Sequence, residues 1–285
     1  DQSRTYAELF ESHDDEENHN EVHTWSQGAG VQALPTYSGV NEVSYSEDWV
    51  YIRTTGLGHH IMGPWYLNEA NTQLFPNFPA NVAAIYRFPR TASSSSSAYE
   101  ITSGGAIGYF VDGVAMFDCR DAFSYINNLG TDGTPNGGNG RGDGIWNRDA
   151  YENERVTFDS ANAHQASDTY HYHANPTALR YLLDDHVEYH ENNTYTEKVG
   201  IPTHHSPIIG WVSDGYPVYG PYGYADANNS ESGIKRMTSG YQKRVMTDRT
   251  SYPDWASRMY AKPTLSTAEY GPNITTQFPI GHYIE

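Results

Sequence analysis

The chain has 285 residues, of which 37% are hydrophobic, and it carries a formal net charge of −18 at pH 7. This excess of negative charge argues against binding to nucleic acid or to an anionic membrane surface, because phosphate groups would be repelled. No run approaches the roughly 18 apolar residues that a membrane-spanning helix needs. We therefore expect neither nucleic-acid binding nor membrane insertion.

Residues 1–30 form an acidic stretch that contains several histidines and few large apolar side chains. This composition predicts a flexible arm or a solvated helix face ahead of the folded domain. It would also suit a loose tail that collects metal ions or binds a partner. Because the chain begins at Asp1 and not at Met, we expect a processed N-terminus and a secreted protein, extracellular or periplasmic.

Residues 31–285 are predicted to form one mainly β domain, sandwich-like or barrel-like, with long loops and a few short helices. Short alternating runs at 49–53, 82–88 and 107–111 are typical of strands. The Asp112-Gly113 pair that follows the third run suits a tight hairpin turn.

One helix is predicted over residues 175–183. Asn175 suits its N-terminal cap, Pro176 suits its first position, and three leucines share one face. His186 and His190 have the i,i+4 spacing that would place both rings on one face of a further helix. Neither pattern alone identifies a function.

The glycine-rich stretch 130–144 is predicted to be a long loop, and its oxygen-bearing side chains imitate a calcium-binding loop. Asp132, Thr134 and Asn136 alternate, a glycine follows, and Asp143 occupies the twelfth place. Calcium takes oxygen ligands in such a pattern, but a glutamate normally stands at the twelfth place. Because glycine-rich loops also produce such matches by chance, calcium is an open alternative here.

The cysteine content and the N-glycosylation sequons bear on whether the protein is secreted. It contains one cysteine, Cys119, so no disulfide can form within it. Three sequons begin at Asn192, Asn228 and Asn273, and in a eukaryotic secreted protein these would accept glycans on surface loops.

Histidine and tyrosine alternate over residues 170–173, as Tyr170-His171-Tyr172-His173, and His164 lies upstream. Residues i and i+2 of a strand point to the same face, so both histidines should project together and both tyrosines oppositely. A pair of imidazoles on a stiff backbone is half of a metal site. The alternative is a half-buried strand whose histidines bond to backbone carbonyls.

His164, His171 and His173 together predict a three-histidine centre for copper or zinc, with an open position for water or substrate. Copper is favoured slightly over zinc. His60 and His205 are further candidate ligands, and hydrogen-bond partners of the ligands are expected to be Tyr170, Tyr172 and Asp214.

Several segments resemble the YHYH-domain proteins, which are named for the tetrapeptide. The resemblance includes 168–176, around the tetrapeptide, and 58–64, which holds Gly-His-His-Ile-Met-Gly-Pro. It continues through 108–117, with Asp112 where the family usually has Asn, and through 206–221. Together these segments span about 45–225. The resemblance implies an extracellular or periplasmic protein, and it implies no particular reaction.

The sequence thus predicts a secreted metal-binding protein that holds a transition metal through the histidines around the tetrapeptide. Two alternatives remain open. One is an extracellular structural protein whose tyrosine-rich surfaces associate with copies of itself or with a partner. The other is a metal-dependent oxidase or hydrolase.

Overall fold

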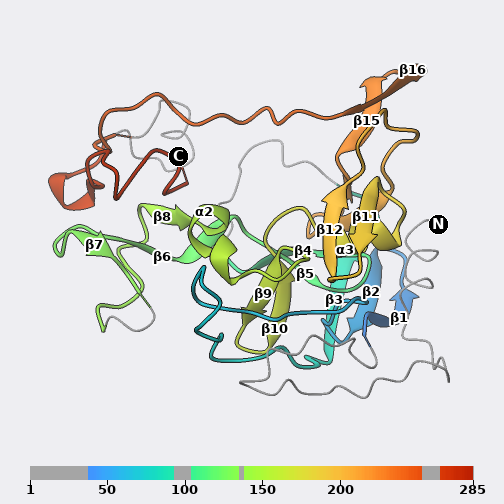
Figure 1. Ribbon diagram of the computed structural model, residues 1–285, viewed down its shortest axis with the longest axis horizontal. Helices are drawn as coiled ribbons and strands as arrows, with labels where there is room; N and C mark the ends of the chain where they lie inside the picture. Colours follow the sequence, from blue (N-terminus) through green and yellow to red (C-terminus); the bar gives the residue numbers. More distant parts are fainter. Residues whose placement is uncertain (1–37, 93–103, 135–137, 252–263, 285) are drawn as a thin grey trace. The chain divides into compact units, whose positions relative to one another are not determined.

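The computed structural model describes residues 38–92, 104–134, 138–251 and 264–284, which Figure 1 shows as coloured ribbon. The predicted arm, residues 1–30, lies outside them. The chain divides into two compact units. The first contains residues 1–93, 106–117 and 156–238, and the second contains 94–105, 118–155 and 239–285.

A six-stranded sheet forms the centre of the first unit, in the order β14-β13-β4-β5-β10-β9. Strand β10 pairs with β5 in parallel, and the other neighbours are antiparallel. The strands are β4 (Ala106–Phe110), β5 (Ala115–Phe117), β9 (Ala163–Ala166), β10 (Thr169–Tyr172), β13 (Ile208–Val212) and β14 (Pro217–Tyr219). The tight turn at Asp112-Gly113 connects β4 to β5, as predicted.

A three-stranded antiparallel sheet lies against this sheet. It consists of β1 (Val40–Tyr45), β2 (Trp49–Thr54) and β3 (Ala84–Pro89). Its buried residues Val40, Ile52 and Phe88 pack with Tyr109 of β4 and Trp211 of β13. The first unit is therefore sandwich-like, and none of the sheets in the described segments closes into a barrel.

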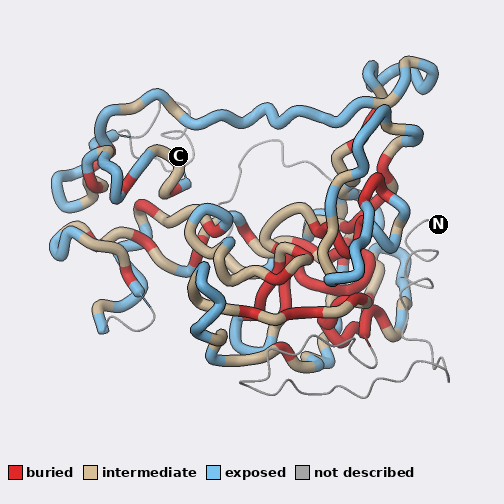
Figure 2. Tube along the Cα trace, in the orientation of Figure 1, coloured by how far each residue is buried: buried red, intermediate tan, exposed pale blue. Residues whose placement is uncertain are grey.

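The main core lies beneath the six-stranded sheet, where Figure 2 shows the buried stretches gathered around β4, β5 and β10. Met62, Val114, Tyr170 and Leu179 are among its fully buried members. A core built from both aromatic and aliphatic side chains offsets the low overall share of apolar residues, because each buried tyrosine removes a large area from water.

The predicted helix is present as α3 (Thr177–Leu182), which begins two residues later than expected. Its Arg180 is fully buried and donates to the carboxylate of Asp185 at 2.7 Å and to Glu197 Oε2 at 3.1 Å. Glu197 belongs to β12 (Thr194–Glu197), so this buried charge fixes the helix to the following hairpin.

Two hairpins complete the first unit: β11 (Val187–His190) with β12, and β15 (Tyr222–Asp226) with β16 (Asn229–Arg236). The helix suggested by the spacing of His186 and His190 is wrong, because residues 187–190 form a strand. The β-branched and aromatic residues of 187–196 pair across the hairpin, and this pairing overrides the histidine spacing.

The second unit contains β6 (Arg120–Ile126), β7 (Thr131–Asp132), β8 (Asn147–Asp149) and α2 (Ala150–Glu154). A short 3₁₀ helix at Thr267–Glu269 belongs to this unit, and another at Arg155–Thr157 follows α2 where the chain returns to the first unit. Its core contains Trp146, Leu265, Phe278 and Tyr283.

In the described part of the chain, no helix has the length and apolar character needed to cross a membrane.

Candidate metal centre

The hairpin of β9 and β10 brings three histidines to one face. His164 of β9 is the direct cross-strand partner of His171 of β10, and paired residues on neighbouring strands share a face. His173 follows His171 by two residues and so projects to the same side. The prediction that His171 and His173 point together is confirmed, and the register adds His164.

The three imidazoles meet through their Nε2 atoms. His173 Nε2 lies 2.9 Å from His171 Nε2 and 3.1 Å from His164 Nε2. Ligands about 2.0–2.1 Å from a tetrahedral zinc ion are about 3.3 Å from one another. The observed separations are slightly shorter, so a small outward movement of the rings would accommodate a metal ion. This is the one such group of His, Cys, Asp or Glu found among the described residues.

The outward-facing nitrogens fix the orientation of two of the rings. His171 Nδ1 lies 3.0 Å from the carbonyl oxygen of Thr169, which can only accept, so this nitrogen carries the proton. The Nε2 atom of neutral His171 therefore presents a lone pair to the cluster. His164 Nδ1 lies 2.7 Å from the hydroxyl of Thr157, which holds that ring from outside in the same way.

A phenylalanine packs against each imidazole. Phe117 stacks on His171 with ring centroids 3.7 Å apart, Phe158 stacks on His173 at 5.2 Å, and Phe75 lies 5.6 Å from His164. His171 is 1% exposed and His164 is 6% exposed. The apolar rings and the surrounding chain therefore shield His164 and His171 from water.

Burial also keeps the histidines neutral. Burial, and after it the neighbouring His173, lowers the pKa of His171 to about 3. Burial, His171 and His173 together hold the pKa of His164 well below its usual range. A neutral imidazole is the form that binds a metal ion, so at neutral pH no proton has to be displaced from Nε2 of His171.

A hollow of about 330 Å³ lies beside the cluster. His173 and Phe117 contribute to its lining, together with Met116 of β5, Tyr219 of β14 and Arg236 of β16. His173 is also the least buried of the three histidines. A small molecule could therefore approach the cluster from the side of His173.

The two tyrosines of the tetrapeptide project to the opposite face, as predicted, and enter the core. The hydroxyl of Tyr170 donates to Asp159 at 2.8 Å, and the hydroxyl of Tyr172 donates to Asp112 at 2.9 Å. His60 lies between them, 3.1 Å from the Tyr170 hydroxyl through its Nε2 atom. All five side chains are buried.

This tyrosine network consists of groups whose charged forms are disfavoured. Burial raises the pKa values of Asp112 and Asp159 to about 6, although hydrogen bonds from the tyrosines oppose the shift. Burial lowers the pKa of His60 to about 3. The pKa values of Tyr170 and Tyr172 lie well above their usual range, again chiefly because both are buried. Around neutral pH the tyrosines and His60 are therefore neutral, whereas the two carboxyl groups are mostly ionised and accept the hydrogen bonds from the tyrosines.

Comparison with known proteins identifies the family. A family model described as YHYH protein matches residues 85–283, which is more than half of the chain. The chain belongs to the YHYH family. Among the curated proteins and the solved structures that were compared, none matches it.

In this YHYH protein the tetrapeptide has two structural roles, one for each residue type. Its histidines contribute two of the three imidazoles of the cluster, and its tyrosines join the buried network with Asp112 and Asp159. Strand alternation produces this division, because successive side chains of β10 point to opposite faces.

Two further predicted ligands lie outside the cluster of the YHYH protein. His60 belongs to the tyrosine network on the opposite face. His205 packs its ring 5.3 Å from Tyr219 and 5.0 Å from Tyr224, and its Nδ1 atom lies 2.6 Å from the carbonyl oxygen of Ser206. Asp214, expected to orient a ligand, is exposed at the turn between β13 and β14.

The residues of the suggested calcium loop have other partners here. The carboxylate of Asp132 lies 2.7 Å from His282 Nε2 and accepts from the Tyr283 hydroxyl at 2.7 Å. The carboxylate of Asp143 accepts from the backbone of Asn127 at 2.8 Å. The backbone of Thr134 donates to Asn139, and Asn136 lies outside the described residues. Calcium binding at this loop stays a prediction.

The three sequons have exposed asparagines. Asn192 lies in the turn between β11 and β12, Asn228 in the turn between β15 and β16, and Asn273 in the second unit. Their exposure would allow glycans to be attached, and glycosylation stays a prediction.

Sequence reasoning did not identify the residues that surround the cluster. Thr157, Phe158, Phe75 and Phe117 come from three separate segments, and none has a recognisable spacing from the tetrapeptide. The Thr157-Phe158 pair is the nearest in sequence to a ligand, a few residues before His164, and both residues contact that ring.

Proposed function

We propose that this protein is a secreted metal-binding protein that holds one transition metal ion between His164, His171 and His173. The observation that supports the proposal is the convergence of the three Nε2 atoms. A single proton on His173 Nε2 would have to be shared between two neighbouring nitrogens at 2.9 and 3.1 Å. One metal ion would accept a lone pair from all three.

The donor set narrows the choice of metal. Three imidazoles suit zinc and copper, and neither a cysteine nor a methionine is part of the ligand set. Copper(II) binds nitrogen ligands more tightly than zinc in the usual order of divalent affinities, so copper is the preferred ion of this site. The net charge of −18 favours attraction of cations to the protein.

The surroundings suit tight binding. The Phe75, Phe117 and Phe158 rings pack against the imidazoles. The contacts of His171 with Thr169 and of His164 with Thr157 orient the ligands in advance. Preorganised ligands lose little conformational freedom on binding, and this raises affinity. The exposed sequons support an extracellular location for such a protein.

Calorimetric titration of the metal-free protein with copper(II) and with zinc(II) tests the proposal. We expect one ion per chain, with copper displacing zinc. His173→Asn should weaken binding by more than about 100-fold, since loss of a mere partner of a ligand already costs about 10–100-fold. His205→Asn, a half-buried histidine outside the cluster, should bind like the wild type. Equal affinity of the two variants would contradict the proposal.

A second candidate function is metal-dependent catalysis, and the hollow beside His173 is the observation that favours it. Three protein ligands leave a coordination position for water or substrate. Cobalt(II)-loaded protein would show whether this position is open. Addition of azide should change the visible absorption spectrum if a small anion reaches the metal, and an unchanged spectrum would favour simple metal holding.

A further inference from the structure

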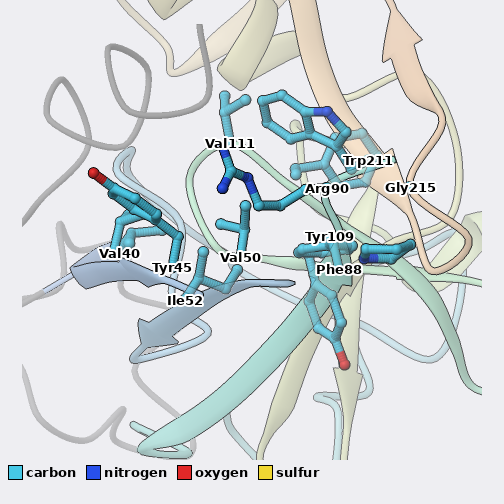
Figure 3. A pocket seen from close by; sticks show the side chains of 13 residues that line it. Val40, Tyr45, Val50, Ile52, Phe88, Arg90, Tyr109, Val111, Trp211 and Gly215 are labelled. Atoms are coloured by element: carbon cyan, nitrogen blue, oxygen red, sulfur yellow. The ribbon is translucent and has the colours of Figure 1, made fainter. Parts of the chain in front are cut away.

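A second cavity lies between the two sheets of the first unit, away from the histidine cluster. Its volume is about 360 Å³, which is at the lower end of the range for small-molecule sites. Figure 3 shows that β1, β2 and β3 supply one wall and that Tyr109, Val111 and Trp211 belong to the other. The lining is apolar with few polar groups, as is usual for a ligand pocket.

The cavity changes character from one end to the other. Val40 and Val111 are 1% and 4% exposed, whereas Tyr45 is 64% exposed. Alternation along β3 places Tyr86 and Phe88 on the inner face, and Arg90 follows them at the end of the strand. A ligand would therefore meet apolar side chains at its buried end and a tyrosine and an arginine at its exposed end.

Among the described residues that line the cavity, Arg90 is the only charged one. Its guanidinium group lies 5.3 Å from the Tyr45 ring, and its Nη1 atom donates to the carbonyl oxygens of Ser46 at 3.1 Å and Glu47 at 3.4 Å. These contacts hold the group beside the cavity, and Figure 3 shows Arg90 among the lining side chains. Within the described segments, no residue accepts a hydrogen bond from Nε or Nη2, the donors that would meet a ligand. No carboxylate of the described residues forms an ion pair with it. Arginine has the planar donor geometry that matches a carboxylate.

We propose that this cavity binds a small amphipathic anion, with an apolar chain between the two sheets and a carboxylate at Arg90. The buried apolar end of the cavity would hold the alkyl chain of the ligand, and Arg90 would pair with its carboxylate head group. A purely apolar ligand would leave the positive charge of Arg90 unused, and a larger polar ligand would bury polar groups without partners. This proposal is independent of the metal site.

Calorimetric titration of the full chain with hexanoate, octanoate and decanoate tests the inference. Each added methylene that enters the cavity should tighten binding, and a pair of them should do so by more than tenfold, since one contributes about fourfold. Decanol, which has the same chain without the charge, should bind at least about tenfold more weakly than decanoate.

Two pairs of variants locate the ligand. Arg90→Gln should weaken decanoate binding about tenfold or more, whereas Arg87→Gln should not, because Arg87 lies on the outer face of β3, over the Trp49 ring at 4.2 Å. Val50→Trp should abolish binding by filling the cavity, whereas Ile85→Trp, at a position that is 66% exposed, should leave it unchanged. Thermal unfolding would confirm that all four variants are folded.

Three results would overturn the proposal. The first is an absence of decanoate binding to the wild-type chain, including the case in which another part of the chain fills the cavity. The second is equal affinity of Arg90→Gln and Arg87→Gln. The third is equal affinity for decanol and decanoate, which would remove the carboxylate from the recognised chemistry.

Discussion

His164 and His171 are direct cross-strand partners in the β9–β10 hairpin, and this pairing assembles the candidate metal centre. The turn at Ser167-Asp168 sets the register. A slip of one residue would pair His171 with Gln165 or Ala163 and send one ring to the opposite face. The site therefore depends on hairpin geometry as much as on the tetrapeptide.

The tyrosines should support the fold and leave metal binding unchanged. Tyr172→Phe removes a donor from the buried carboxylate of Asp112, so we expect the free energy of unfolding to fall by about 1–3 kcal/mol. Tyr189→Phe, which removes an exposed hydroxyl that donates to Asn193, should cost no more than about 0.5 kcal/mol. Urea unfolding measures both, and loss of the metal from Tyr172→Phe would contradict this division of roles.

The core beneath the sheet should be sensitive to truncation at α3. Leu179 is fully buried, so Leu179→Ala should lower the free energy of unfolding by about 2–5 kcal/mol. Leu182, on the same helix, is 37% exposed, and Leu182→Ala should cost clearly less. Chemical denaturation of the two variants compares them directly. Equal losses of unfolding free energy in the two variants would show that Leu179 contributes no more to the core than Leu182 does.

His60 should make stability depend on pH. Its folded pKa is about 3, and an unfolded histidine titrates near 6.5, so between these values the unfolded chain binds a proton that the folded protein does not. Stability from this group is complete above about pH 6.5 and is lost as pH falls toward 3. Asp112 and Asp159, with raised pKa values, act in the opposite direction between 3.8 and about 6.

A variant isolates the contribution of His60. Between pH 6 and pH 4 the free energy of unfolding of the wild type should decrease more steeply than that of His60→Asn, by about 1 kcal/mol per pH unit. Metal-free protein should be used, so that ligand protonation by acid is not mixed with metal loss. Parallel pH profiles would show that His60 is not held neutral in the folded protein.

Much of the fold was predictable because its signals are local. Alternation identified β2, β3 and β4, the Asp112-Gly113 pair identified a hairpin turn, and the spacing of the leucines identified α3. The predicted cap of α3 is wrong, because Pro176 and not Asn175 occupies the N-cap position. The division into two units was not predicted. It depends on contacts between residues 118–155 and the segment after 239, which are far apart in sequence.

The candidate site was predictable only in part, for the same reason. Strand alternation places His171 and His173 together, whereas His164 joins them through hairpin register. Nothing in the sequence distinguishes His60 and His205 from the three ligand histidines. In the structure, His60 belongs to the buried tyrosine network, and His205 packs on Tyr219 and Tyr224. Phe75 and Phe117 reach the cluster through tertiary packing, which leaves no periodic signal in the sequence.

Elemental analysis by plasma mass spectrometry tests the central claim most directly. The full chain is equilibrated with copper and zinc, freed of unbound metal, and analysed beside the His171→Asn/His173→Asn double variant and the His205→Asn control. We expect about one copper or zinc ion per chain in the wild type and the control, and none in the double variant. A wild type without either metal, or a double variant that retains it, would contradict a metal centre at these histidines.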